Sequence, residues 1–289
     1  MADSPQTIDQ IIADVRSRLP LLERGASFNH AGVAPQPLSD AVPRFQRARS
    51  EKISDEFFRT VADVPGRIRS AYAALLNVSD DEIAVTHNTA EGINVVAQGL
   101  DWREGDRILT VNVEYPSNVY PWWNLRDRGV EIVTVDERDG RVDLNEFIDA
   151  IDERVRLVAI SHVEFASGYV FDLDKLAGAC RERDVFLCVD LAQSLGALPI
   201  DLSKVDAAAW PTWKWLMGPV GMGGFYLSKR RLDEVRPVFV GSDGMKSGRN
   251  YLDYRFEFED GAKRFEYSTG NVVGMIEVFT VITEIGVGS

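Results

Sequence analysis

The sequence predicts an α/β fold, with a mostly parallel sheet of seven strands flanked by helices. Short β-branched runs alternate with longer amphipathic segments, which is typical of a doubly wound sheet. Several of the runs are apolar throughout, as expected of strands that are covered on both faces. A length of 289 residues with 45% hydrophobic content is sufficient for one sizeable core.

Seven segments are predicted as strands. In chain order they are residues 83–86, 107–113, 130–135, 157–163, 185–190, 207–210 and 224–227. Helices are expected between them, and two of these follow Asp143 and Asp172, which are good N-terminal caps. The expected helices cover residues 90–98, 118–128, 144–151 and 173–183.

The two ends of the chain depart from this alternation. Residues 5–22 are predicted as a helix that leads into the extended segment SFNHAGVAPQP. Beyond about residue 237 the strand pattern stops, and a last helix is expected over 272–285. Its apolar face has no later element to pack against, which suggests a missing C-terminal part. The expected division is an N-terminal helix and arm over 1–24, a large domain over 25–237, and an incomplete small domain over 238–289.

Composition argues against several classes of function. The net charge of -13 disfavours nucleic acid and anionic membranes as partners. The first residues lack the apolar stretch of a signal peptide, and no apolar run approaches the length of a membrane span. Cys180 and Cys188 lie in apolar stretches and are expected to be free buried thiols, which favours a cytoplasmic location. The three histidines lack metal-ligand spacing, so no metal site is expected.

Polar and aromatic side chains follow several predicted strands at one edge of the sheet. Ligands of open parallel sheets bind at this edge, beyond the carboxyl ends of the strands. The edge gathers a helix N-terminus, an aromatic ring, a carboxylate and a lysine. In chain order the residues are Thr89, Tyr115, Asp190 and Lys214.

This set matches the needs of pyridoxal 5′-phosphate (PLP). Its phosphate binds at a helix N-terminus, its ring stacks on an aromatic side chain, its pyridine nitrogen pairs with a carboxylate, and its aldehyde forms a Schiff base with lysine. Taken one at a time, Asp190 can be a turn residue, Tyr115 can be a core residue, and Thr89 can be a helix cap. Lys214 can be a surface lysine, but its segment WPTWKWLMGP makes a charge costly. The position of all four residues at one edge of the sheet favours a PLP site over these separate structural roles.

At these residues the chain resembles the class V aminotransferase superfamily, whose members are PLP-dependent fold type I enzymes. The superfamily includes cysteine desulfurases, kynureninases and isopenicillin-N epimerase-like proteins. The resemblance extends from SFNHAGVAP to FEYSTGN, which is most of the chain. HNTAEGIN is similar to the phosphate-binding turn, which implies that Thr89 and the N–H of Ala90 hold the phosphate. EYPSNVYPW is similar to the segment whose first ring, here Tyr115, stacks on the cofactor.

The remaining motifs imply further roles. VDLAQSLGA is the most specific match, and it implies Asp190 on the pyridine nitrogen and Gln193 near the ring hydroxyl. WKWLMGPVGMGGFYL resembles the lysine segment, which makes Lys214 the Schiff-base residue. FEYSTGN resembles a loop that reaches the neighbouring subunit's phosphate in family dimers. That likeness implies a homodimer in which Thr269 acts across the interface.

Some positions depart from the family pattern. Trp213 stands where histidine or tyrosine usually precedes the lysine, although its indole N–H can still donate a hydrogen bond. Pro211 disturbs a serine or threonine position for which Thr212 substitutes, and the resemblance implies that Thr212 and Trp213 contact the cofactor. Phe165 replaces an asparagine that touches the ring hydroxyl in desulfurases. Family members usually continue into a small domain that carries the substrate-binding arginine and, in desulfurases, the nucleophilic cysteine. We expect this chain to lack most of that domain.

The resemblance implies a PLP-dependent transferase or lyase, cysteine desulfurase-like, that acts on a small amino acid through a Lys214 aldimine. In this interpretation Lys214 also moves the α-proton and Asp190 keeps the ring an electron sink. The alternative is a degenerate or truncated relative that folds, can bind PLP without turnover, and serves as a binding or interaction protein. A nicotinamide-dependent oxidoreductase is disfavoured because GPVGMGG precedes a predicted strand instead of following one into a helix.

Overall fold

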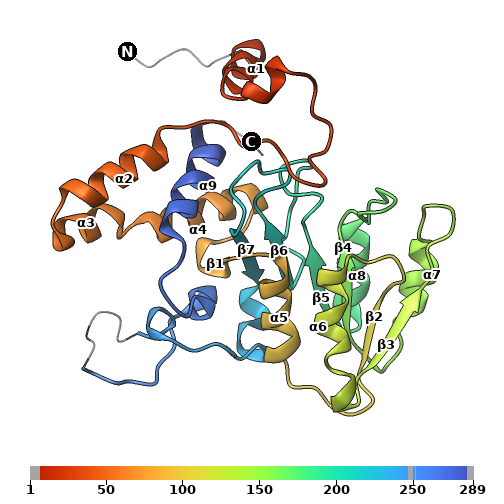
Figure 1. Cartoon of the computed structure of the whole chain (residues 1–289). Helices are drawn as coiled ribbons and strands as arrows, with labels where there is room; N and C mark the ends of the chain where they lie inside the picture. Colours follow the sequence, from red (N-terminus) through yellow and green to blue (C-terminus); the bar gives the residue numbers. More distant parts are fainter. Residues whose placement is uncertain (1–6, 247–249, 251, 285–289) are drawn as a thin grey trace.

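A seven-stranded sheet forms the centre of the protein (Figure 1), with the strand order β1-β7-β6-β5-β4-β2-β3. The structure is a computed structural model that describes residues 7–246, 250 and 252–284. β7 runs antiparallel to both of its neighbours, and the other neighbouring pairs are parallel. The strands are β1 Ile83–Thr86, β2 Arg107–Val111, β3 Glu131–Val135, β4 Val155–Ser161, β5 Phe186–Asp190, β6 Ala207–Pro211 and β7 Gly223–Leu227. The predicted fold class and all seven predicted strands are confirmed.

Both faces of the sheet are covered, as the apolar runs predicted. In β5, Leu187 and Val189 belong to one buried cluster, whereas Phe186 and Cys188 belong to another on the opposite face. The first cluster takes in side chains of α4 (Val64–Leu76), α8 (Leu173–Glu182) and α9 (Val272–Glu284), and the second those of α5 (Thr89–Gly99). Helices α2, α4 and α9 gather beside β1 and β7 (Figure 1). Two apolar layers therefore hold the strands, and their carboxyl ends stay free to carry polar groups.

The prediction of a single helix over residues 118–128 is wrong. The segment instead folds as η3 Pro116–Asn118, the short α6 Tyr120–Trp123 and η4 Arg126–Arg128. Pro121 has no N–H to continue a helix from the preceding turn, so a new helical segment begins around it. Asn118 accepts the indole N–H of Trp122 at 2.9 Å, and Gly129 ends the segment with a left-handed φ of 82°.

Other helices were predicted well or were not predicted at all. The elements α7 (Leu144–Asp149), α8 and α5 match their predicted positions, and α9 matches up to residue 284. The N-terminal prediction divides into α1 (Ile8–Ser17) and η1 (Pro20–Glu23), while its residues 5 and 6, like residue 285, lie outside the described part. Helices α2 (Ala41–Glu51), α3 (Ser54–Val61) and α4 were not predicted from the sequence.

Among the described residues, no helix has the length and apolar character needed to cross a bilayer. Within the same part of the chain, no group of three or more histidine, cysteine, aspartate or glutamate side chains could hold a metal ion. Cys180 and Cys188 are both free and buried, as the sequence predicted. Burial raises the pKa of each thiol, so both are held in the protonated form.

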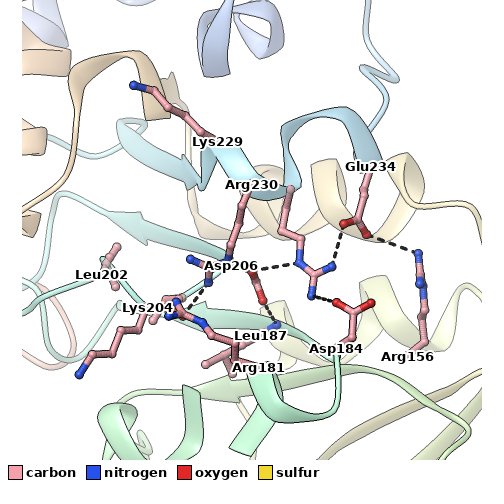
Figure 2. Close-up of polar contacts among 12 residues, drawn as sticks. Arg156, Arg181, Asp184, Leu187, Leu202, Lys204, Asp206, Lys229, Arg230 and Glu234 are labelled. Atoms are coloured by element: carbon pink, nitrogen blue, oxygen red, sulfur yellow. Dashed lines mark hydrogen bonds and ion pairs between the residues drawn. The ribbon is translucent and has the colours of Figure 1, made fainter. Parts of the chain in front are cut away.

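A buried carboxylate joins three segments at the amino ends of the strands (Figure 2). Asp206 lies just before β6, and its Oδ2 accepts the backbone N–H of Leu187 in β5 at 2.9 Å. Its Oδ1 accepts from the guanidinium groups of Arg230 at 2.8 Å and Arg231 at 3.2 Å, both in η5 (Lys229–Glu234). Asp184 and Glu234 complete the network around Arg231 (Figure 2). The carboxylate therefore fastens the chain after β7 to the middle of the sheet.

Replacing Asp206 with alanine should lower the free energy of unfolding by ~3–5 kcal/mol, because it removes a buried carboxylate that accepts hydrogen bonds from Arg230, Arg231 and the Leu187 N–H. Urea unfolding at neutral pH measures this loss. The matched control is Asp174→Ala, which breaks an ion pair with Lys204 whose side chains are 79% and 51% exposed. That change should cost less than about 1 kcal/mol. Equal losses in the two variants would contradict the structural role of Asp206.

Candidate functional site

The N-terminus of α5 opens at the carboxyl edge of the sheet. Asn88 caps the helix by accepting the N–H of Glu91 on its side-chain oxygen at 2.9 Å. Thr89 is the first helical residue and is buried, and Ala90 follows it. The first N–H groups of a helix have no partners within it, so this end can bind an anion.

Gly223 of β7 lies between this helix mouth and β6. A Cβ built at this glycine would lie 3.1 Å from the Asn88 Cα and 2.4 Å from the Trp210 carbonyl oxygen. Any side chain there would push β7 away from β6 or from the start of α5. The absence of a side chain thus allows β7 to pack closely against both β6 and the start of α5.

Asp190 ends β5 and lies buried at this edge. Its Oδ1 accepts the N–H of Ala192 at 2.7 Å. Burial raises the pKa of the Asp190 carboxyl to about 6, and the positive charge of Lys214 opposes that rise. The carboxylate is therefore ionised at neutral pH and lies within the electrostatic reach of the lysine.

Lys214 lies in a tight turn after β6. The N–H of Met217 donates to the Lys214 carbonyl at 2.9 Å, and Met217 adopts a left-handed φ of 53° that is unusual for a residue with a side chain. The amine is half-buried, and burial lowers its pKa, whereas Asp190 opposes the change. This direction agrees with the expectation from the sequence and increases the fraction of neutral amine.

An aromatic ring faces the lysine. The Lys214 Nζ lies 5.3 Å from the centroid of the Tyr115 ring, and Phe165 packs edge-on against the same ring at 5.3 Å. Tyr115 is 44% exposed, so its ring is accessible to a planar group. The structure therefore brings together three of the predicted site residues, namely Tyr115, Asp190 and Lys214.

The segment before α2 anchors the lysine turn through Gln193 and Trp215. Gln193 donates its amide N–H to the carbonyl of Ala31 and accepts the indole N–H of Trp215, both at 3.0 Å. His30 stacks on Trp215 at 5.5 Å, and the N–H of Ala34 donates to the Trp213 carbonyl at 3.0 Å. Each end of the Gln193 amide keeps one further hydrogen-bonding capacity. Contacts of Gln193 and Trp213 with a cofactor stay predictions.

Two predicted residues lie in different surroundings. Thr212 is fully buried, and its hydroxyl lies 2.6 Å from the Pro219 carbonyl oxygen and 3.1 Å from that of Met222, which ties the lysine turn to the start of β7. Thr269 is exposed and lines a cavity of about 250 Å³ beside His87 and Glu91. Neither Tyr115, Asp190 nor Lys214 lines that cavity.

Several buried polar residues at the same edge were assigned no role from the sequence. The N–H of His162 donates to the Asp190 carbonyl at 2.9 Å, and burial lowers the pKa of its imidazole to about 4, so the ring is neutral. Glu114 and Glu164 are also buried. The available signal was the position of Glu114 and Glu164 directly after predicted strands, which by itself does not distinguish a site residue from a turn residue.

Comparison with known proteins places the chain in a family. The family profile described as Aminotransferase class-V matches residues 50–288. A probable cysteine desulfurase of Methanothermobacter thermautotrophicus is 34% identical over 274 residues, which cover 91% of this chain and 67% of the relative. A probable cysteine desulfurase of Pyrococcus abyssi is 29% identical and covers 92% of this chain and 68% of the relative.

Solved structures give the same result. A C-DES mutant with glycine covalently linked to its PLP cofactor has a TM-score of 0.87 at 26% identity, covering 93% of this chain and 73% of the other. The cystine C-S lyase C-DES in complex with cysteine persulfide has a TM-score of 0.86 at 27% identity, covering 93% and 74%. From the profile match, the sequence identity and the shared fold, the chain belongs to the class-V aminotransferase family.

Proposed function

We propose that this protein is a PLP-dependent enzyme that acts on a small amino acid, with Lys214 as the residue that bonds covalently to the cofactor. The observation that carries the proposal is the position of the Lys214 amine, which faces the Tyr115 ring and interacts electrostatically with the buried Asp190 carboxylate. Family membership, and the PLP bound in the C-DES mutant, support the same cofactor.

The donor groups present fit PLP. An ionised, buried carboxylate suits a protonated pyridine nitrogen, an accessible ring suits the cofactor face, and the open N-terminus of α5 suits a phosphate. A lysine with a lowered pKa suits bond formation with an aldehyde. When bound, PLP supplies an electron sink for the negative charge that develops at the substrate α-carbon.

The residues of the chain would bind and orient the cofactor and transfer the proton. Asp190 would hold the positive charge of the ring nitrogen, and the N–H of His162 fixes the backbone that carries this carboxylate. The Lys214 amine would remove and return the proton at the substrate α-carbon, for which a pKa nearer to neutrality is favourable. Tyr115 would orient the ring, and Thr89 and Ala90 would bind the phosphate.

A sulfur-containing amino acid is the substrate that the relatives support, because those named above are described as cysteine desulfurases and a cystine C-S lyase. Cys180 lies in α8 and Cys188 in β5, and both are buried with raised thiol pKa values. Neither thiol is therefore suited to receive sulfur from the substrate. We also propose a cytoplasmic homodimer in which Thr269 reaches the phosphate of the neighbouring subunit.

Borohydride reduction in the presence of PLP tests this proposal. The purified protein should show the visible absorption of PLP bound to a lysine, and reduction followed by peptide mass spectrometry should locate the label on Lys214. Cysteine or another small amino acid should then change the spectrum of the unreduced protein. A label on another lysine would overturn the assignment, and a bound cofactor that no amino acid perturbs would favour the binding protein without turnover. Sedimentation of the same sample reads the oligomeric state, and a monomer would remove the role of Thr269.

A further inference from the structure

Two buried glutamates stand directly before the two aromatic residues of the site. Glu114 precedes Tyr115 after β2, and Glu164 precedes Phe165 after β4. The two residues are 7% and 1% exposed. Burying two carboxyl groups is costly unless each finds a hydrogen-bond partner or a proton, so their environment needs an explanation.

Glu114 is held by the end of the neighbouring strand. Ser161 donates its N–H to one carboxylate oxygen of Glu114 at 2.5 Å and its hydroxyl to the other at 2.6 Å. In the sheet, Ser161 pairs with Asp190 of β5. The Glu114 carboxylate therefore bridges β2 to β4 at the level of the Asp190 carboxylate.

Glu164 lies in a tight hairpin. Its backbone N–H donates to Tyr169, its carbonyl accepts from Gly168, both at 2.9 Å, and Val163 pairs with Val170. Among the described residues, neither carboxyl oxygen of Glu164 has a donor. The charged groups around it are the carboxyl groups of Glu114, Asp190 and Glu137.

Proton sharing resolves this arrangement. Burial and then the neighbouring Glu114 carboxylate raise the pKa of Glu164, and burial raises the pKa of Glu114 as well. Two carboxyl groups in contact cannot both stay ionised in a buried site, so one keeps a proton and donates it to the other. Glu114 already accepts two hydrogen bonds from Ser161, which favours the ionised form on Glu114 and the proton on Glu164.

We propose that Glu164 is protonated at neutral pH and donates an O–H···O hydrogen bond to Glu114, and that this bond holds Phe165 against Tyr115 as a positioning contact for the site. Each glutamate is followed by one of the two rings. The Glu164–Glu114 hydrogen bond and the edge-on contact of Phe165 with Tyr115 therefore hold the same two loops together. That Tyr115 then orients a cofactor rests on the proposed function; the proton sharing itself does not.

The shared proton makes the contact between Glu164 and Glu114 depend on pH. The folded protein binds this proton more tightly than the unfolded chain, whose carboxyl groups have the ordinary pKa of 4.5. The contact is therefore complete below that value and is lost as the pH rises through the raised pKa of the pair. Alkaline pH should place two like charges between the loops after β2 and β4 and separate them.

Infrared spectroscopy of the cofactor-free protein tests the proton directly. At mildly alkaline pH the wild type should show the carbonyl stretch of a protonated carboxylic acid, and this band should disappear in Glu164→Gln. The control Glu146→Gln changes an exposed glutamate that pairs with Arg138 and should leave the band intact. A wild-type spectrum without the band overturns the proposal, and that measurement requires no variant to fold.

Hydrogen exchange of the same cofactor-free protein tests the positioning. After correction for intrinsic rates, the amides of residues 162–171 should lose protection in the wild type as the pH rises, while Glu164→Gln, whose amide can still donate to Glu114, should stay protected. Glu164→Ala should exchange about tenfold faster at neutral pH, as expected for the loss of one hydrogen bond to a charged group. Equal pH profiles for wild type and Glu164→Gln would overturn the positioning role. Failure of PLP to bind would count against the proposed function alone.

Discussion

Replacing Lys214 with alanine should lower the turnover of the amino-acid substrate by about 10⁴-fold, which is the largest effect that we expect from any single substitution. The reason is that one amine would serve both as the attachment point of the cofactor and as the base at the α-carbon. No other cation is described against the Tyr115 ring within residues 7–246, 250 and 252–284. Steady-state kinetics with saturating PLP measure the loss, which should fall on kcat more than on KM.

The matched control is Lys175→Ala. Lys175 donates to Asn145 at 2.7 Å on the exposed surface of the α7 and α8 pair, and its loss should leave turnover within about twofold of wild type. An exogenous small amine should partly restore proton transfer in Lys214→Ala if the side chain acts as a base. A variant that keeps normal turnover, and still shows PLP attached to a lysine, would remove Lys214 from the centre of the site.

The strands were predictable because local sequence determines them. The run that forms β5 is apolar on both faces, and the structure buries it in two separate clusters, so the pattern alone was sufficient. The order of strands placed the residues at their carboxyl ends along one edge, which is how Asp190 and Lys214 could be grouped from the sequence. The helix over 118–128 failed because Pro121 interrupts the hydrogen bonding of the helix and the apolar periodicity does not register this.

Contacts between distant segments were not predictable in the same way. Nothing in the sequence near Glu114 indicates that Ser161 donates twice to its side chain, since the partners are 47 positions apart. Likewise, Thr212 was expected to contact the cofactor, but its hydroxyl is turned toward the carbonyls of Pro219 and Met222. Motifs indicate which residues meet at an edge, whereas the direction of each side chain depends on tertiary packing.

Replacing Asp190 with asparagine should lower turnover by about 10²–10³-fold and at the same time stabilise the cofactor-free protein. The loss of turnover follows because an amide cannot balance the positive charge of a protonated ring nitrogen. The gain in stability follows from burial: the rise of the Asp190 pKa from 3.8 to about 6 corresponds to ~3 kcal/mol of strain from the ionised carboxylate at neutral pH. Asparagine keeps an oxygen for the Ala192 N–H and does not ionise.

The pH dependence separates this account from simple damage to the fold. A raised pKa means that the folded protein binds the proton more tightly, so wild-type stability should increase as the pH falls from above 6 toward 3.8, and Asp190→Asn should not follow this change. The affinity of the wild type for PLP should fall over the same range as the carboxylate is protonated. Urea unfolding and PLP titration measure the two effects. The control Asp172→Asn, at a helix cap that asparagine also satisfies, should change neither. If Asp190→Asn were destabilised and its PLP affinity kept the wild-type pH profile, the carboxylate would be a packing residue and would have no part in binding the cofactor.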